Sequence, residues 1–399
     1  MNRIGFTLGL VPVLGLSIAA GFHFRVAAST PTIPQITLLR TPHGGIQPQT
    51  ELDRDGVLHM IYFKGDASAG DIEYVERQPG AQDFSRPIRV NSEPRSAVAI
   101  GTVRGPQIAI GRNGRAYAIW FGSQKSGGPA GTIPVLFSRL NDSRTAFEPQ
   151  RDLMQYATGG DGGLSVAADA RGDVCVVWHA MGAEPGEEHR RVYMARSTDD
   201  GKTFAREVPI SPATLGACGC CGMRAIADER DTLYVLYRAA AESVHRDMTL
   251  LTSTDQGSTF GAARVDSWEL NACPMSTAYL SEGGREVLAA WEKAGQVYFE
   301  EIEQDPRKVP PVFAAPGEGA NRKHPAVAAN ANGLVLLVWT EGTGWLKGGS
   351  LAWQVFDSAG KATRPGFLCG DSQARSQITR ETLRLFIDAS GTGGEATSR

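Results

Sequence analysis

The chain has 399 residues, of which 42% are hydrophobic and 21% are charged. This composition excludes a disordered or fibrous protein, and a net charge of −3 leaves no domain-wide basic surface for nucleic acid. The 47 glycines and 22 prolines supply the turns that an all-β fold with many short connections requires.

Residues 1–28 have the pattern of a secretory signal peptide. Arg3 precedes an apolar run from Ile4 to Phe22, and the small residues Val26-Ala27-Ala28 offer a cleavage site. The alternative is an uncleaved anchor over residues 4–24, which are just numerous enough to span a bilayer. We therefore expect a secreted or periplasmic protein, in contact with a membrane only if this segment stays uncleaved.

The rest of the chain is built on a repeat in which a short strand, a turn rich in Asp, Asn and Gly, and an apolar run ending in an aromatic residue follow one another. The six closing aromatic residues are Tyr62, Trp120, Trp178, Tyr237, Trp291 and Trp339. Their spacing of 48 to 59 residues predicts a propeller with one four-stranded blade per repeat. We predict an all-β, six-bladed β-propeller of antiparallel blades over residues 29–370, with Ile33–Leu39 adding a strand to the last blade, and a polar, partly disordered extension over 371–399.

Two octapeptides in this region share the pattern S-x-D-x-G-x-T-F, at Ser197–Phe204 and Ser253–Phe260. In such a turn the aspartate bonds nearby backbone N–H groups and the glycine takes a positive φ. The pattern resembles the Asp-box, or BNR repeat, of the sialidase superfamily, whose members are six-bladed propellers. The resemblance implies a sialidase-like glycoside hydrolase, of exo-sialidase type if an enzyme, or a binder of acidic glycans. Asp-boxes also occur in propellers without sialidase activity, so they predict a fold more firmly than a reaction.

The resemblance also implies which residues would act. Sialidases of this superfamily hold the sugar carboxylate with three arginines and use an aspartate acid/base and a tyrosine nucleophile paired with glutamate. Their first arginine stands in an Arg-Ile-Pro motif, which here reads Ile46-Gln47-Pro48, and no Tyr–Glu pair is apparent because Tyr279 falls inside a first strand. The candidate catalytic residues are Arg104, Asp161, Arg224 and Arg238.

An alignment of the six blade starts predicts a sulfur-rich site at the mouth of the central channel. In this alignment Cys221-Gly222-Met223 and Cys273-Pro274-Met275 are the same C-x-M motif in neighbouring blades. Thiolate and thioether donors select copper(I), and imidazole is compatible with it. The candidate metal ligands are Cys218, Cys220, Cys221, Met223, Cys273, Met275 and His324.

Two other interpretations of the cysteines stay open. An oxidising compartment favours a disulfide from Cys221 or a neighbour to Cys273, and a redox-active thiol pair is the third possibility. Function is expected on the face that carries the long connections between strands 2 and 3 and between blades. The functions considered are therefore binding or hydrolysis of a glycan or another small molecule on that face, a copper or thiol-redox site, and non-catalytic protein interaction.

Overall fold

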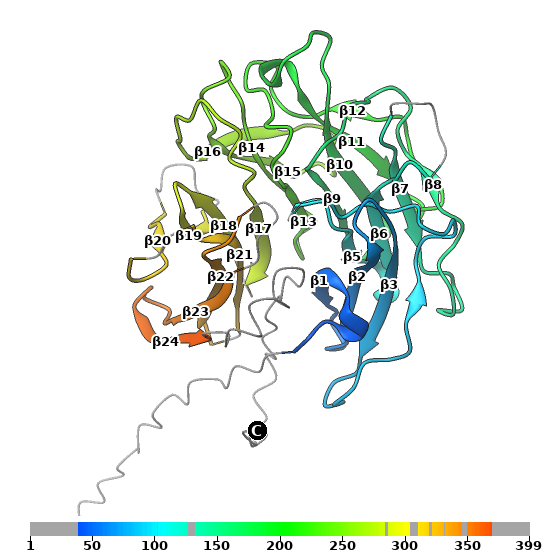
Figure 1. The fold of residues 1–399 in the computed structure, drawn as a ribbon, viewed down its shortest axis with the longest axis horizontal. Coiled ribbons are helices and arrows are strands. Elements are labelled where there is room, and N and C mark those ends of the chain that lie inside the picture. The colour runs from blue at the N-terminus through cyan, green and yellow to red at the C-terminus, as the bar shows by residue number, and fades with distance from the viewer. Residues whose placement is uncertain are drawn as a thin grey trace, which may run out of the picture. The chain divides into compact units, whose positions relative to one another are not determined.

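The structure is a computed structural model that describes residues 39–101, 103–126, 132–283, 286–303, 310–318, 321–330, 332–344 and 349–368. Over these ranges the chain forms six four-stranded antiparallel sheets, each made of strands that are consecutive in sequence. The sheets surround a common centre, with the first strand of each sheet innermost (Figure 1). The predicted six-bladed all-β propeller is confirmed.

The blades follow the chain in order. Blade 1 holds β1 (Ile46–Leu52), β2 (Leu58–Asp66), β3 (Ala69–Arg77) and β4 (Ile88–Arg89), and blade 2 holds β5 (Gln107–Ile110), β6 (Ala116–Phe121), β7 (Val135–Arg139) and β8 (Arg151–Asp152). Blade 3 holds β9 (Leu164–Ala168), β10 (Val174–Ala180), β11 (Arg191–Ser197) and β12 (Val208–Pro209), and blade 4 holds β13 (Arg224–Ala227), β14 (Leu233–Arg238), β15 (Met248–Ser253) and β16 (Gly261–Asp266). Blade 5 holds β17 (Ala278–Gly283), β18 (Glu286–Lys293), β19 (Gln296–Ile302) and β20 (Phe313–Ala314), and blade 6 holds β21 (Lys323–Ala329), β22 (Val335–Glu341), β23 (Ser350–Phe356) and β24 (Ala362–Leu368).

The closing aromatic residue of every repeat lies on the second strand of its blade and is at most 3% exposed. Two of these rings have hydrogen-bonded indole nitrogens: that of Trp178 donates to the carbonyl of Ala157 at 3.0 Å, and that of Trp291 to the Asp266 carboxylate at 2.9 Å. The second strands are apolar on both faces because neighbouring blades cover both faces, and large aromatic rings fill the space between them.

The two octapeptide turns form the hydrogen bonds that their sequence predicts. Thr203 donates its backbone N–H and its hydroxyl to the Asp199 carboxylate, at 2.8 and 2.7 Å, and the Ser197 hydroxyl accepts from the N–H of Gly201 at 3.0 Å. The same bonds recur in the turn around Asp255. The turns are therefore held by their own side chains, and they connect the third and fourth strands on the face away from the long loops.

Strand registers define which residues lie at the same level in the channel. In each blade one first-strand residue pairs with the residue just before the closing aromatic. These six residues, here called the channel layer, are Gln49, Gln107, Ser165, Arg224, Tyr279 and Ala326. Met223 precedes the layer by one residue, whereas Met275 precedes it by four.

The predicted equivalence of the two C-x-M motifs is therefore wrong. The chain before β17 carries three more residues than the chain before β13, a difference that spacing of aromatic residues does not reveal. By register the counterpart of Cys221 in blade 5 is Ser276, and the counterpart of Arg104 in blade 3 is Gly162 rather than Asp161.

The predictions at the two ends of the chain are not tested. The signal peptide or anchor and the polar extension lie outside the described residues, as does the expected N-terminal strand except Leu39, which belongs to no strand. The fourth strand of blade 6 is β24. In the part of the chain that the structure describes, no helix has the length and apolarity to cross a membrane.

Candidate functional site

Arg224 lies inside the channel and is only 3% exposed. One terminal nitrogen of its guanidinium donates to the side-chain oxygens of Gln49 and Gln107, at 3.2 and 3.1 Å, and the other pairs with the carboxylate of Glu51. The guanidinium also stands 4.9 Å from the ring centre of Tyr279. This predicted catalytic arginine thus connects the first strands of four blades, and Glu51 offsets its charge.

A cavity opens at the loop end of the channel, lined in part by the channel layer. Its polar side chains are those of Gln47, Gln49, Gln107, Arg224, Thr277, Tyr279 and His324. No aspartate or glutamate of the described residues lines it. The cavity therefore offers amide, hydroxyl and imidazole groups together with one aromatic ring and one charge-compensated arginine.

Gln47 stands where the resemblance would place an arginine. Its amide nitrogen donates to the carbonyls of Ala99 and Gly101, at 2.8 and 2.7 Å, and its backbone adopts a left-handed φ of 50°. A side chain held in this way is fixed in orientation, so the first blade presents an amide at this point of the cavity.

Arg104 and Asp161 lie together at the mouths of blades 2 and 3. The Nε of Arg104 donates to the backbone carbonyl of Asp161 at 2.9 Å, and a terminal nitrogen pairs with its carboxylate. Their side chains are 21% and 36% exposed. These two predicted catalytic residues are thus brought into contact, but each neutralises the other.

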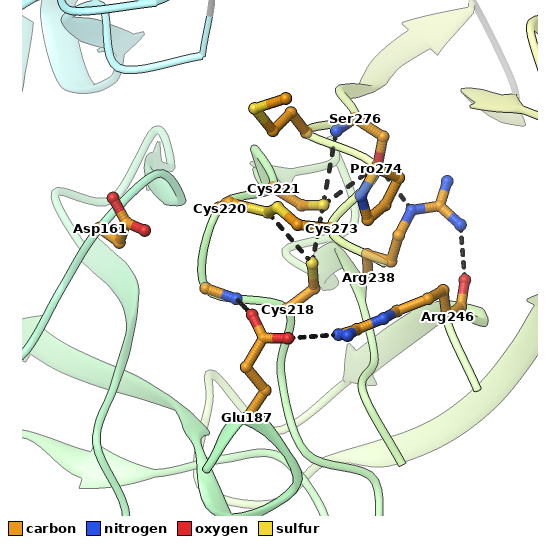
Figure 2. Close-up of a disulfide and its surroundings, with 12 residues drawn as sticks. Asp161, Glu187, Cys218, Cys220, Cys221, Arg238, Arg246, Cys273, Pro274 and Ser276 are labelled. Carbon is orange, nitrogen blue, oxygen red and sulfur yellow. Dashed lines mark hydrogen bonds and ion pairs between the residues drawn. A yellow bond between two sulfur atoms is a disulfide. The ribbon is translucent and has the colours of Figure 1, made fainter. Parts of the chain in front are cut away.

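Arg238 is buried and supports the loops instead of facing the cavity. Its three nitrogens donate to the Ser276 hydroxyl and to the carbonyls of Arg246 and Glu292, each at 2.6 Å. It joins the end of β14 to the loop before β17, and its positive charge lies beside the cysteine cluster (Figure 2).

Four cysteine sulfurs face one another between blades 4 and 5 (Figure 2). Cys220 and Cys273 form a disulfide between the loop before β13 and the loop before β17. Cys218 Sγ lies 3.0 Å from Cys221 Sγ and 3.6 Å from Cys220 Sγ, and Cys218 and Cys221 are free thiols. The expectation that a neighbour of Cys221 bonds to Cys273 is therefore met by Cys220.

The pKa values of the two free thiols are shifted in opposite directions. Burial alone would raise the pKa of Cys221, but hydrogen bonding from Cys218, the charge of Arg238 and the hydrogen bonds from Ser276 lower it to about 7. Ser276 donates its N–H and its hydroxyl to Cys221 Sγ at 3.4 and 3.3 Å. The hydrogen bond to Cys221, together with burial, raises the pKa of Cys218. Cys218 therefore holds the proton, and Cys221 has thiolate character near neutral pH.

The other predicted metal ligands have different surroundings. Met223 is 4% exposed and packs in the core between blades 3 and 4, and it also borders the cavity. Met275 sits in a loop with a φ of 46°, where Lys323 Nζ donates to its carbonyl at 3.3 Å. His324 Nδ1 lies 2.9 Å from the hydroxyl of Thr340.

Only cysteine sulfurs gather into a donor group among the described residues: those of Cys218, Cys220 and Cys273 lie within 4.8 Å of one another. A thiolate binds copper(I), whereas a disulfide sulfur carries no thiolate charge. The donor set therefore fits the predicted copper only after Cys220 and Cys273 are reduced.

Several residues of the site were not anticipated from the sequence. Glu187 accepts from the N–H of Gly219 at 2.9 Å and pairs with Arg246 at 2.7 Å, which fixes the cysteine loop against blade 3 (Figure 2). Ser276, Glu51 and the glutamines were missed because only the strand register shows that they meet. Tyr279 was set aside as a strand residue, yet its ring reaches the cavity.

No family model matches the sequence, and no curated protein matches it. Solved structures similar in fold include a Trypanosoma rangeli sialidase in complex with the inhibitor DANA, at 10% identity and a TM-score of 0.49, which covers 76% of this chain and 54% of that one. A Penicillium chrysogenum α-L-arabinanase complexed with arabinobiose has 10% identity and a TM-score of 0.48, over 80% of this chain and 95% of that one. A Hadza microbial sialidase has 16% identity and a TM-score of 0.46, and the match covers 74% of this chain and 66% of the sialidase. At these identities the likeness is one of fold alone.

Proposed function

We propose that this protein is an exported, sialidase-like propeller that binds a saccharide in the cavity at the loop end of its channel. The observation that carries the proposal is the composition of the cavity. Three glutamine amides, a threonine, a histidine and a tyrosine line it on a rigid scaffold. Amide groups both donate to and accept from sugar hydroxyls, and an aromatic ring covers the apolar face of a sugar.

Arg224 does not select for an acidic sugar in this proposal. The carboxylate of Glu51 and the oxygens of Gln49 and Gln107 already accept from both terminal nitrogens of its guanidinium, and Glu51 compensates its charge. A carboxylate on the ligand would have to compete with Glu51 in order to bind. We therefore expect neutral and acidic saccharides to bind with similar affinity.

The test is calorimetric titration with lactose and with 3′-sialyllactose. The expected result is saturable binding of both, with dissociation constants within about threefold of each other and weakened about tenfold or more in Tyr279→Ala, since a lost stacking contact of about 1.4 kcal/mol is a factor of ten. Tyr298→Ala is the matched control, because Tyr298 is half-buried on β19 and does not line the cavity. Failure of both sugars to bind, or equal binding by Tyr279→Ala and the wild type, would overturn the proposal.

Turnover is the finer question, since the resemblance implies a sialidase. The lining offers no carboxylate in the described part of the chain, and Tyr279 is the only tyrosine there. We propose binding without hydrolysis, because a glycosidase needs either two carboxylates or a tyrosine nucleophile with a partner base. Release of the fluorophore from a fluorogenic sialoside, lost in Tyr279→Phe and in Arg224→Ala, would instead identify a hydrolase.

Export rests on residues 1–28, whose basic start, apolar run and small residues match a signal peptide. A secreted or periplasmic location agrees with the disulfide between Cys220 and Cys273, because disulfides persist in oxidising compartments. Amino-terminal sequencing of the protein recovered outside the cytoplasm tests this, and a chain that still begins at Met1 would favour the membrane anchor.

Copper binding is retained as a second candidate function because the sulfur atoms converge. It requires the reduced protein, so metal analysis after anaerobic reduction and addition of copper(I) is the test. One tightly held copper per chain, lost in Cys218→Ser, would support it; no retained copper would remove it.

A further inference from the structure

The cysteine cluster contains one disulfide and, next to it, two free thiols. The disulfide of Cys220 and Cys273 lies toward solvent, since Cys220 is half-buried and Cys273 is exposed. The two thiols lie behind it, with Cys218 and Cys221 only 1% and 2% exposed. A solvent-facing disulfide is thus backed by a buried dithiol.

Cys218 occupies the position that connects the two pairs. Its sulfur is 3.6 Å from that of Cys220 in the disulfide and 3.0 Å from that of Cys221. Thiol–disulfide exchange needs a thiolate close to a disulfide sulfur. Cys218 can become that thiolate by passing its proton to the Cys221 sulfur, with which it is in contact.

We propose that the four cysteines form a thiol–disulfide exchange centre in which the buried dithiol of Cys218 and Cys221 reduces the exposed disulfide of Cys220 and Cys273. This activity is separate from saccharide binding. It requires no external oxidant or reductant, because both redox partners belong to the same chain.

The exchange proceeds in two balanced steps. Cys218 gives its proton to Cys221 and its thiolate attacks Cys220 Sγ; the Cys220–Cys273 bond breaks, and its electron pair leaves on Cys273, which takes a proton from solvent. Cys221 then loses its proton to solvent and attacks Cys218 Sγ; the Cys218–Cys220 bond breaks, and Cys220 leaves with the electron pair and is protonated. Two electrons have moved from the inner pair to the outer pair; of the two protons that the outer pair gains, one replaces the proton that the inner pair released and the other comes from solvent.

The surroundings suit this exchange. Ser276 donates two hydrogen bonds to Cys221 Sγ, which orients the resolving sulfur. Lys323 donates to the carbonyls of Pro274 and Met275, at 3.1 and 3.3 Å, so the loop next to Cys273 stays in place after the covalent link opens. The exchange therefore replaces a link between two blades by a link within one loop.

The test alkylates the folded, unreduced protein with N-ethylmaleimide and maps disulfides and adducts by mass spectrometry after an acid quench. Exchange exposes the Cys273 and Cys220 thiols, where the reagent traps them. The expected product carries maleimide on Cys220 and Cys273 and a new disulfide between Cys218 and Cys221. A wild-type protein that keeps the Cys220–Cys273 disulfide while Cys218 and Cys221 become labelled, or while nothing is labelled, would overturn the proposal.

Three variants make the assignment specific. Cys218→Ser removes the attacking sulfur and is expected to slow labelling of Cys273 at least tenfold. Cys221→Ser removes only the second step, so it is expected to yield a Cys218–Cys220 disulfide with maleimide on Cys273 alone. Cys175→Ala is the matched control, because Cys175 is a buried free thiol in β10 outside the cluster, and its labelling pattern should equal that of the wild type. Identical patterns in Cys218→Ser and the wild type would contradict the mechanism.

Discussion

Arg224 is the residue that connects the polar side chains inside the channel. A buried guanidinium needs both hydrogen-bond acceptors and a compensating charge, and Gln49, Gln107 and Glu51 supply them from blades 1 and 2. The arginine that sequence comparison would assign to substrate therefore serves first to join blades across the axis. By donating to the side-chain oxygens of Gln49 and Gln107, it also fixes the orientation of these two amides.

Replacing Arg224 by alanine should destabilise the propeller by about 3 kcal/mol, because Glu51 and two glutamine oxygens lose their partner at once. Arg224→Lys should lose less, since it keeps the charge but reaches fewer acceptors. Urea unfolding at pH 7 measures both. Equal stability of Arg224→Ala and the wild type would contradict the structural role given to this residue.

Glu300 on β19 is a buried carboxyl group that makes the stability of the fold depend on pH. Burial, with the negative charge of Asp266 nearby, raises the pKa of Glu300 to about 7. The folded state thus favours the protonated form, so the contribution of Glu300 to stability is greatest below the ordinary glutamate pKa of about 4.3 and declines as the pH rises through 7.

Glu300→Gln should therefore stabilise the protein at pH 8, by roughly 2 kcal/mol, and have little effect at pH 4. Thermal unfolding at the two pH values measures the difference. Glu301→Gln is the control, because Glu301 is the exposed neighbour of Glu300 and points to the opposite face of the strand. A stabilisation of equal size at pH 4 and pH 8 would exclude ionisation as the cause.

The octapeptide turns are elements that side chains of their own sequence stabilise. Burial alone would raise the pKa of Asp199, but the hydrogen bonds from Thr203 and Ser197 outweigh it and lower the pKa to about 2. The stabilising effect of this carboxylate is therefore complete above the unfolded pKa of about 4 and is lost as the pH falls through 2.

Asp199→Ala should lower the melting temperature at pH 7, and the gap to the wild type should close as the pH is reduced from 4 toward 2. Asp199→Asn tests whether charge matters beyond hydrogen bonding, since it keeps one acceptor oxygen. Thermal unfolding followed across this pH range is the measurement; a gap that stays constant would show that the carboxylate charge contributes nothing.

The strands themselves were predictable, whereas their relative registers were not. Apolar runs ending at Trp120 or Trp291 mark second strands because only such runs suit a position covered on both faces. The loop before β17 carries three extra residues that displace Met275 from the level of Met223. The contacts that this loop makes, such as that of Ser276 with Cys221, have no local pattern in the sequence that would reveal the extra residues.

The disulfide acts at the scale of the whole molecule because it joins two blades. Cys220 and Cys273 are 53 residues apart, and closing a loop of that length in the unfolded chain corresponds to about 4 kcal/mol. The double variant Cys220→Ala/Cys273→Ala should lose about this much in urea unfolding. A loss no larger than that of Cys175→Ala would mean that the link between the blades is energetically neutral.

The architecture followed from the sequence more completely than the site did. Six repeats predicted six blades, and the clustering of Cys218, Cys220, Cys221 and Cys273 followed from placing two loops in neighbouring blades. Which cysteine bonds to Cys273, and which side chains meet Arg224, depend on distances of a few ångströms across the axis. Such contacts join residues far apart in the chain, 53 positions for Cys220 and Cys273 and 117 for Arg224 and Gln107, so no local pattern specifies them.

The central claim is that the loop end of the channel is the saccharide site, and hydrogen exchange with and without lactose tests it most directly. Saturating lactose should slow exchange in peptides that contain 103–107 and 222–224, which border the cavity. Peptides that contain the turns 53–57 and 228–232, at the other end of the channel, should be unaffected. Protection confined to those turns, or none in any peptide, would contradict the account.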